Sequence, residues 1–566
     1  MRERLCIALL IAIILLAYGN TLLNGFTMDD ELYIFRNPTV TNLSLGGIFE
    51  PTKATNLFRP LTYGSLIVNW AVEGGHPFGY HVFNLLLHVA VTVLLYLVLR
   101  KLLEGLPRGE IAAWVAALLF AVHPIHSEAV ASIMGRSELL AAGFLLAAWL
   151  LHLHDQSILA LVCFILALLS KESAVAFVPL VIAGDYARRQ WKPLHRYGVI
   201  SGIAAAYLVL LWKVQGGRFG ANSVSYLDNP LAHFPVSLRI PNALRIAWKY
   251  VGLQIYPATL SCDYSYNAIL LYSKWQRNAP AMIAAICVVA LWIWTLRTSR
   301  REWFLTGAIY LGAFAVTANI LVPTGTIMGE RLAYLPSAGF CLLVALIWMW
   351  FAERNQRVAW AVLMIVLLAL SARTVARNRD WRDNFSLYSA GVRAVPGSAK
   401  MHANLAFQYY YRGQLDAAQQ ELQTALRIFP NLPDGVGLKA LIEGHEGNDQ
   451  LARGLLQNEL ALMTKDSPNY DFIAVNLAAV LVKMGENQEA LTLLNEEIAK
   501  SPGLSRAWSN RAVIRYRQGD ILSARSDAEM AMQLNPRDAQ AQNLLGLLNS
   551  SLPPTSTSHD RQIISP

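Results

Sequence analysis

Apolar runs separated by short polar clusters fill the chain from its start to about residue 372, and no long apolar run follows. Several runs are shorter than the roughly 20 residues that cross a bilayer upright, so we expect them to use their polar flanks or to cross a thin or protein-lined region. The pattern predicts an all-α bundle of about eleven membrane spans. The candidate spans are residues 5–18, 80–100, 111–123, 139–154, 157–169, 173–184, 197–214, 280–297, 303–321, 331–351 and 358–372.

The basic residues predict an orientation for this bundle. When the spans are threaded alternately, five clusters of Lys and Arg fall in one set of loops, and such clusters favour the cytoplasm. The segment 242–258 is moderately apolar but carries Arg245 and Lys249. Counting it as a span would move the later basic clusters outside, so we interpret it as an interfacial helix. The N-terminus is then cytoplasmic, and the first run is an uncleaved span because Ala17-Tyr18-Gly19 is a poor cleavage site. The clusters are Arg2/Arg4, Arg100/Lys101/Arg108, Arg188/Arg189/Lys192/Arg196, Arg297/Arg300/Arg301 and Arg354/Arg357.

The remaining polar clusters share the non-cytoplasmic side. Asp29, Asp30 and Glu31 follow the first span, where an acidic run is commonly only solvated but can also supply a catalytic base or ligand. Lys171 and Arg331 each have an acid beside them in sequence, and simple ion pairing would explain both. Several cations at one leaflet, however, favour the binding of a phosphate. The other clusters are Arg59 in the first large outer loop, His123-Pro124-Ile125-His126-Ser127-Glu128 with Arg136, Lys171-Glu172, the loop 215–279 and Met328-Gly329-Glu330-Arg331.

We expect no metal centre, disulfide or nucleic-acid partner. The spacing of His123, His126 and Glu128 could serve a metal, but Pro124 disfavours a regular helix there and no further ligand set is evident. Four of the five cysteines lie inside apolar runs, and Cys262 stands alone in a polar loop. The net charge of +9 includes many basic residues that flank spans, which accounts for it without a nucleic acid.

The polar part of the chain, residues 373–549, contains a repeat with a period near 34 residues. The spacing is typical of tetratricopeptide repeats, in which a glycine ends the first helix, a small residue lets the second pack closely, and a proline precedes the next pair. Such arrays bind extended peptides or protein faces, although many only hold complexes together. We expect residues 550–566 to be a disordered tail. The repeated positions are Pro396, Pro430, Pro468, Pro502 and Pro536; Gly413, Gly447, Gly485 and Gly519; and Ala418, Ala452, Ala490 and Ala524.

An ordered set of motifs in residues 1–372, followed by these repeats, resembles the transmembrane and tetratricopeptide-repeat O-mannosyltransferases and their bacterial relatives, within the GT-C glycosyltransferase superfamily. The resemblance covers nearly the full chain. It rests on Met28-Asp29-Asp30 through Asn37-Pro38, Arg59-Pro60-Leu61-Thr62, Tyr80-His81-Val82-Phe83-Asn84 to His88, Phe120 through Val130 with Gly135-Arg136, Ser170-Lys171-Glu172, Asp263-Tyr264-Ser265-Tyr266 and Glu330 through Ser337.

The resemblance implies a GT-C-like membrane domain over residues 1–372 that takes a sugar, mannose in the family, from a polyprenyl-phosphate carrier to an acceptor hydroxyl with inversion. Asp29, with Asp30 beside it, would be the catalytic acidic site. Lys171 and Arg331, then Arg136, Arg59 and His123, would bind the lipid phosphate, and His126, Glu128 and Glu330 complete the substrate-binding set. No cofactor is predicted, and a divalent ion on the acidic run stays open.

Compartment and acceptor follow from the same comparison. Four repeats and the absence of a retention signal at Ile563-Ile564-Ser565-Pro566 favour a bacterial inner-membrane protein with a periplasmic array, or a lumenal array in the endoplasmic reticulum of a eukaryote. A protein is the expected acceptor or partner of the array. Two alternatives remain open: the same chemistry on a glycan or lipid acceptor, and a non-catalytic membrane-anchored scaffold.

Overall fold

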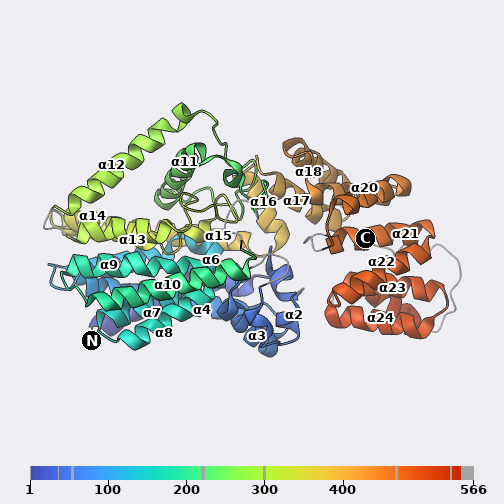
Figure 1. Ribbon diagram of the computed structural model, residues 1–566, viewed down its shortest axis with the longest axis horizontal. Helices are drawn as coiled ribbons and strands as arrows, with labels where there is room; N and C mark the ends of the chain where they lie inside the picture. The colour runs from blue at the N-terminus through green and yellow to red at the C-terminus, as the bar shows by residue number, and fades with distance from the viewer. Residues whose placement is uncertain are drawn as a thin grey trace. The chain divides into compact units, whose positions relative to one another are not determined.

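The fold is described from a computed structural model in which residues 2–35, 37–51, 57–217, 224–297, 301–465, 470–535 and 538–549 are placed (Figure 1). Every regular element in these ranges is helical, which confirms the all-α prediction. Arg36 and Arg300, the repeat prolines Pro468 and Pro536, and the predicted tail 550–566 lie outside the described residues.

The chain forms two compact units. The first consists of Met1–Glu31, Asn42–Pro51 and Asn56–Met401, and the second consists of Leu32–Thr41, Thr52–Thr55 and His402–Pro566. A single helix runs through residue 372 as far as Asp380, and so belongs to the first unit. The division of the chain at 372 into a transferase domain and a repeat domain stays a prediction.

A helix occupies each of the eleven predicted spans. Six helices are long and apolar enough to cross a membrane: Glu3–Leu23, Phe78–Leu102, Ile133–Leu153, Leu194–Val214, Trp275–Thr295 and Gln356–Asp380. The pair Gly109–Val122 and Pro124–Ala131, bent by 54°, would make a seventh. The described residues therefore support a multi-pass bundle with six or seven full-length spans, and eleven crossings remain a prediction. The eleven helices are α1 (Arg2–Tyr18), α4 (Phe78–Leu102), α5 (Gly109–Val122), α7 (Arg136–Leu153), α8 (Ser157–Ser170), α9 (Phe177–Arg188), α10 (Leu194–Val214), α12 (Ala279–Thr295), α13 (Arg301–Phe314), α14 (Ser337–Ala352) and α15 (Gln356–Asp380).

Small residues let the central helices of this bundle approach closely. Helix α5 packs against α14, α4 and α1, and its alanines at positions 112, 113, 116 and 117 are fully buried. At Gly339 of α14, a Cβ atom would lie 2.5 Å from the backbone of α13 at Thr306 and Tyr310. Because lipid is as apolar as these side chains, close packing rather than the hydrophobic effect holds membrane helices together.

The polar motifs lie on short elements between the long helices. The chain enters α3 (Pro60–Glu73) directly after Arg59, and turns η4 (Pro124–His126), η6 (Glu172–Ala176) and η10 (Glu330–Ala333) carry three further motifs, with α6 (Ser127–Ala131) following η4. Pro124 opens η4 at the bend after α5, in agreement with the prediction that this proline disfavours a regular helix there. Helix α11 (Val236–Ile255) covers the segment predicted to be interfacial and is not one of the six full-length spans.

The repeat pattern corresponds to successive helix pairs. Gly413, Gly447, Gly485 and Gly519 each follow the first helix of a pair and have φ of 70°, 92°, 83° and 82°, a left-handed conformation that favours glycine. The four repeat alanines have no exposed surface. The pairs are α17 (Ala399–Tyr411) with α18 (Leu415–Ile428), α19 (Pro433–His445) with α20 (Asp449–Leu462), α21 (Tyr470–Met484) with α22 (Asn487–Lys500), and α23 (Ser505–Arg517) with α24 (Ile521–Leu534); α16 (Asn384–Ala394) precedes them and α25 (Ala539–Asn549) follows.

Candidate active site

The acidic run after α1 is folded into a tight turn that separates its two aspartates. The Thr27 N–H donates to Asp30 Oδ2 at 2.8 Å, and the Asp30 N–H donates back to the Thr27 carbonyl at 3.2 Å. Met28 takes a left-handed φ of 51°, and its N–H donates to Asn384 Oδ1 at 2.8 Å. As a result Asp30 is buried at 1% exposure, whereas Asp29 points to the exposed side.

The two carboxyl groups therefore have different chemistry. Burial raises the pKa of Asp30 to about 7, with the Thr27 hydrogen bond opposing the rise and the neighbouring charge of Asp29 adding to it. A buried carboxyl that accepts a backbone hydrogen bond suits a role in holding the turn. The exposed carboxyl of Asp29 is the one that a substrate can reach.

Arg331 lies within electrostatic reach of Asp29. Its side chain is one-third exposed and forms a close ion pair with the buried Glu128, which also accepts the Arg331 backbone N–H at 2.8 Å. Glu128 is the main cause that raises the pKa of Arg331; burial opposes it, and Asp29 and Glu138 raise it further. An exposed carboxylate and a partly exposed guanidinium are thus placed together by segments about 300 residues apart.

Two more ion pairs extend the cluster. The Lys171 ammonium is buried in a close pair with Glu138, and Arg59 forms a two-pronged pair with Glu172 through Nε at 3.2 Å and Nη2 at 2.9 Å. Although burial opposes ionisation of Glu172, Arg59 and Lys171 lower its pKa to about 2. Burial lowers the pKa of Lys171, and the nearby Arg59 and Arg331 lower it further against the pull of Glu138.

Glu330 pairs elsewhere than with its sequence neighbour Arg331. Its Oε1 accepts the Ser261 N–H at 2.6 Å and the Tyr264 hydroxyl at 2.8 Å, and its Oε2 lies 3.7 Å from Arg377 Nη2. Burial raises the pKa of Glu330 to about 7, with Arg377 opposing. Lys171 likewise bonds Glu138 rather than Glu172. The interpretation that each cation pairs with the acid next to it in sequence is therefore wrong, because the side chains of two consecutive residues contact different parts of the bundle.

Arg136 is part of the framework of this region. It is fully buried, and its guanidinium donates to Asn84 Oδ1 at 3.0 Å, the Tyr80 carbonyl at 3.1 Å and the Ser65 carbonyl at 3.2 Å, with the Phe83 ring 4.6 Å away. These bonds tie α7 to α3 and α4 and use every nitrogen of the guanidinium.

The predicted histidines also bond within the bundle. His123 Nε2 bonds the Gln254 carbonyl at 2.9 Å, and His126 bonds the Phe120 carbonyl at 3.0 Å and Ser337 Oγ at 2.8 Å. Both rings are buried. In the part of the chain that is described, no group of three or more His, Cys, Asp or Glu side chains is arranged to hold a metal ion.

Three residues of this region were not singled out from the sequence: Glu138, Arg377 and Asn384. Glu138 and Arg377 supply the partners of Lys171 and Glu330, and Asn384 pins the acidic turn. Glu138 follows Arg136 by two residues at the start of an apolar run, a place where an acid requires a counterion. The need for a counterion could therefore have pointed to Glu138 from the sequence alone.

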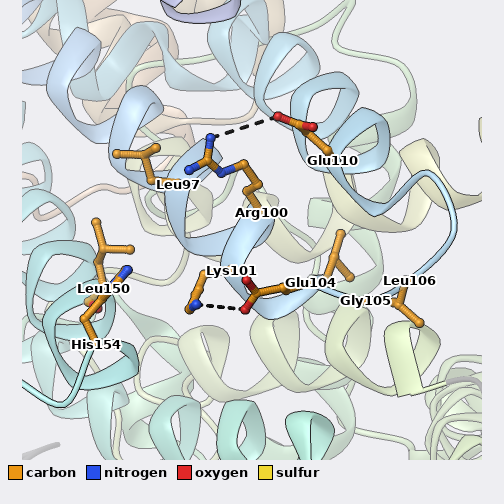
Figure 2. Close-up of a pocket in the computed structure, with 10 residues that line it drawn as sticks. Leu97, Arg100, Lys101, Glu104, Gly105, Leu106, Glu110, Leu150 and His154 are labelled. Carbon is orange, nitrogen blue, oxygen red and sulfur yellow. Dashed lines mark hydrogen bonds and ion pairs between the residues drawn. The ribbon is translucent and has the colours of Figure 1, made fainter. Parts of the chain in front are cut away.

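One pocket in the described part of the chain lies elsewhere. It is a cavity of about 590 Å³ at the C-terminal end of α4, lined by Arg100, Lys101, Glu104 and Glu110 among others, and Figure 2 shows these side chains. From Tyr80, which bonds Arg136, to Arg100 is a helical rise of about 30 Å. Arg100 bonds Glu3 at 2.8 Å and Lys101 bonds Glu104 at 2.8 Å, so these charges are already paired. This cavity is not part of the acidic site.

A second pocket, of about 360 Å³, lies beside α11. It is lined by Arg245, Ile246, Lys249, Ala268, Ile269, Leu270 and Tyr272. The same helix contacts the cluster, because the Tyr250 hydroxyl donates to the Gly329 carbonyl and accepts the Gly329 N–H, both at 2.9 Å. The turn that carries Arg331 is thus fixed to α11.

Known proteins are similar to this chain in sequence. A protein O-mannosyl-transferase of Caenorhabditis elegans is 30% identical over 440 residues, which are 75% of this chain and 62% of that protein. Over most of its length the chain is similar to protein O-mannosyl-transferases. The one named TMTC3 in Mus musculus is 26% identical over 601 residues, 94% of this chain and 64% of that protein. The chain thus spans a little under two thirds of these relatives, and no protein-family model matches it.

Solved structures match only weakly. A fragment of MamA from Desulfovibrio magneticus RS-1 is 22% identical with a TM-score of 0.22, covering 27% of this chain and 84% of that one. YrrB, described as a TPR protein with an unusual peptide-binding site, is 16% identical with a TM-score of 0.22, covering 35% of this chain and 97% of that one. At these TM-scores neither likeness bears on the fold or the function.

Proposed function

We propose that this chain is a membrane glycosyltransferase that moves mannose from a polyprenyl-phosphate carrier to a serine or threonine hydroxyl of a protein, on the non-cytoplasmic face. The observation that carries the proposal is the exposed carboxylate of Asp29 in a pinned turn, within electrostatic reach of the partly exposed Arg331. Similarity to protein O-mannosyl-transferases supports the sugar and the class of acceptor.

In the proposed reaction Asp29 acts as the general base. Its carboxylate takes the proton of the acceptor hydroxyl as the hydroxyl oxygen attacks the anomeric carbon. The bond from that carbon to the phosphate oxygen breaks, and its electron pair leaves with the phosphate. One displacement inverts the anomeric centre. Arg331 faces the growing negative charge of the departing phosphate and stabilises it in the transition state.

The other predicted residues have supporting roles in this proposal. Lys171 and Arg59 add positive charge to the field of the site, each held by an acid. Glu128 orients Arg331. Asp30 holds the acidic turn, and Glu330 holds the Asp263–Tyr266 stretch. Arg136, His123 and His126 fix the helices around the site, and we assign them no contact with substrate, because their polar atoms bond protein groups.

The topology and the repeat array complete the proposal. Five basic clusters in alternate loops support a cytoplasmic N-terminus and an array on the opposite side of the membrane, in a periplasm or a lumen. There the array binds the acceptor or a partner protein, as arrays of stacked helix pairs do. No resident cofactor is part of the proposal.

The test is a transfer assay with purified full-length protein. Wild type, Asp29→Asn and a control, Glu50→Gln, are supplied with polyprenyl-phosphate mannose carrying radiolabelled sugar and with an extract of secreted proteins. Glu50 is an exposed acid of the same outer segment, so its loss removes equal charge. We expect Asp29→Asn to lower transfer by about 10²–10⁴-fold, the range typical of general-base catalysis, and Glu50→Gln to leave it unchanged.

Three outcomes would count against parts of the proposal. Equal transfer by Asp29→Asn and wild type would remove Asp29 from the reaction. Label that appears in a glycan or a lipid but not in protein would show that the acceptor is not a protein. Transfer that is abolished by EDTA and restored by Mg²⁺ or Mn²⁺ would place a divalent ion in the site.

A further inference from the structure

Each of the three cations of the acidic site forms an ion pair with an acid, whereas Arg245 and Lys249 of α11 form none in the described residues. Arg59, Lys171 and Arg331 are paired with Glu172, Glu138 and Glu128. No ion pair within the described ranges involves Arg245 or Lys249. In sequence, residues 236–280 contain five basic residues and a single acid, Asp263. The free positive charge of this side of the molecule is therefore concentrated on α11 and the segment after it.

Aromatic rings and one backbone carbonyl hold these cations in place: Arg245 Nη2 donates a close hydrogen bond to the Leu270 carbonyl, which leaves the positive charge without an acid. The Arg245 guanidinium lies 4.1 Å from the centre of the Tyr272 ring, whose other neighbour is Arg277 at 5.3 Å, and the Lys249 ammonium lies 4.8 Å from the Tyr264 ring. A ring orients a cation without cancelling its charge. Burial lowers the pKa of Lys249, and the like charge of Arg245 lowers it further, against the attraction of Glu330. An anion bound here would relieve that repulsion.

The pocket combines these charges with an apolar surface. Arg245 and Lys249 lie four residues apart on one face of α11, so both head groups border the same cavity of about 360 Å³. Ile246, Ile269 and Leu270 supply apolar walls. A ligand that fits must be an anion joined to an apolar group.

A long apolar surface begins beside this pocket. The Trp248 indole N–H donates to the Ala281 carbonyl at 3.0 Å, which ties α11 to the first turn of α12. None of the residues of α12 is buried, and Figure 1 shows this helix at an angle to α13 and α14. Ile283, Ile286 and Trp294 are each more than 60% exposed. A hydrocarbon chain can therefore follow α12 away from the pocket.

We propose that Arg245 and Lys249 bind the phosphate of the polyprenyl-phosphate carrier, whose chain lies along α12. This inference rests on the proposed function. Two unpaired cations suit the released carrier, because a phosphate monoester carries nearly two negative charges at neutral pH, whereas the phosphodiester of the sugar donor carries one. Tyr250, next to Lys249, is bonded to Gly329, so the phosphate site is anchored to the turn that bears Arg331.

Binding can be measured without any transfer reaction. Full-length wild type, the double variant Arg245→Gln/Lys249→Gln and the control Lys213→Gln are titrated in detergent with geranylgeranyl phosphate and with geranylgeraniol, which has the same chain and no phosphate. Lys213 is an exposed cation without an ion pair in the described residues. We expect the double variant to bind geranylgeranyl phosphate at least tenfold more weakly, and both proteins to bind geranylgeraniol equally. The control should bind both lipids as wild type does.

A second variant guards against loss of folding. Ala268→Phe fills the pocket and leaves both cations in place, so it should also weaken binding while the thermal unfolding midpoint stays near that of wild type. Equal binding of geranylgeranyl phosphate by wild type and the double variant would overturn the inference. So would equal competition by inorganic phosphate or by phosphatidylglycerol, which would indicate a free-anion or a general lipid site.

The transfer assay separates this inference from the proposed function. If both hold, added geranylgeranyl phosphate inhibits transfer by the double variant more weakly than transfer by wild type, whereas Asp29→Asn lowers kcat with lipid binding intact. If the phosphate binds as expected and no variant transfers sugar, only the proposed reaction fails. If geranylgeranyl phosphate inhibits the double variant as strongly as wild type, only the phosphate site fails.

Discussion

The buried pair of Lys171 and Glu138 gives a direct test of how the site is held together. Their side chains are 5% and 9% exposed, so neither charge is solvated once its partner is removed. Breaking a buried ion pair by truncating one partner typically costs about 3–5 kcal/mol, whereas replacing both charges is often nearly neutral. We therefore expect Lys171→Met and Glu138→Gln each to destabilise the protein strongly, and the double variant to regain most of the loss.

The neighbours of the pair predict which single variant is worse. Arg59 and Arg331 both act on Lys171. After Lys171→Met these cations partly compensate Glu138, so the cost should be near the lower value, about 3 kcal/mol. After Glu138→Gln the buried ammonium loses its hydrogen-bonded acid and keeps only the attraction of Glu172 against the repulsion of Arg59 and Arg331, so the cost should approach the upper value, about 5 kcal/mol.

The assay is a double-mutant cycle on the full-length protein, with unfolding followed in detergent. The matched control is the pair Lys101 and Glu104, whose groups are 2.8 Å apart with side chains 27% and 59% exposed. An exposed pair of this kind contributes about 0.2–1 kcal/mol. Additive effects of Lys171→Met and Glu138→Gln, or a coupling no larger than in the control, would refute the reasoning.

Two further predictions concern single positions. Because burial raises the folded-state pKa of Asp30 to about 7 from 3.8, ionisation of Asp30 opposes folding. The contribution of Asp30 to the free energy of unfolding is therefore complete below about pH 4 and declines as the pH rises to about 7. Asp30→Asn keeps an oxygen for the Thr27 N–H, so unfolding measured from pH 4 to pH 8 should show a smaller decline than in wild type, and an unchanged slope would contradict the burial argument. In the array, Ala490 has no exposed surface. Ala490→Leu should lower the free energy of unfolding by about 1–3 kcal/mol through overpacking, measured against Ala499→Leu, the same change at an exposed alanine of α22; similar small losses for both would contradict close packing at Ala490.

Local regularities of the sequence were enough to predict the helices. Apolar runs placed a helix at each of the eleven expected positions, and repeat spacing placed the glycines after the first helix of each pair and the alanines in buried contacts. These features depend on the conformation of consecutive residues. Helix length could not be obtained in the same way, because α8 ends and α14 begins at short turns that carry the chain through the polar motifs.

The ion pairs of the site were decided by tertiary structure. Glu138 and Lys171 are 33 residues apart, Arg59 and Glu172 are 113 apart, and Glu128 and Arg331 are 203 apart. A sequence shows how many acids and cations reach one side of the membrane, but not which helix ends pack together. For this reason the sequence offered Glu172 as a possible partner of Lys171, whereas the structure pairs Lys171 with Glu138.

The sequence by itself determined the helical class, the repeat array, and the polar segments that gather at the ends of the helices, because periodicity and composition are properties of short stretches of chain. Only the tertiary structure separated the exposed Asp29 from the buried Asp30, bonded Arg136 into the framework, and left Arg245 and Lys249 without an ion pair in the described residues. Exposure and charge pairing depend on which distant segments pack around a side chain, and those segments are brought together only when the bundle folds.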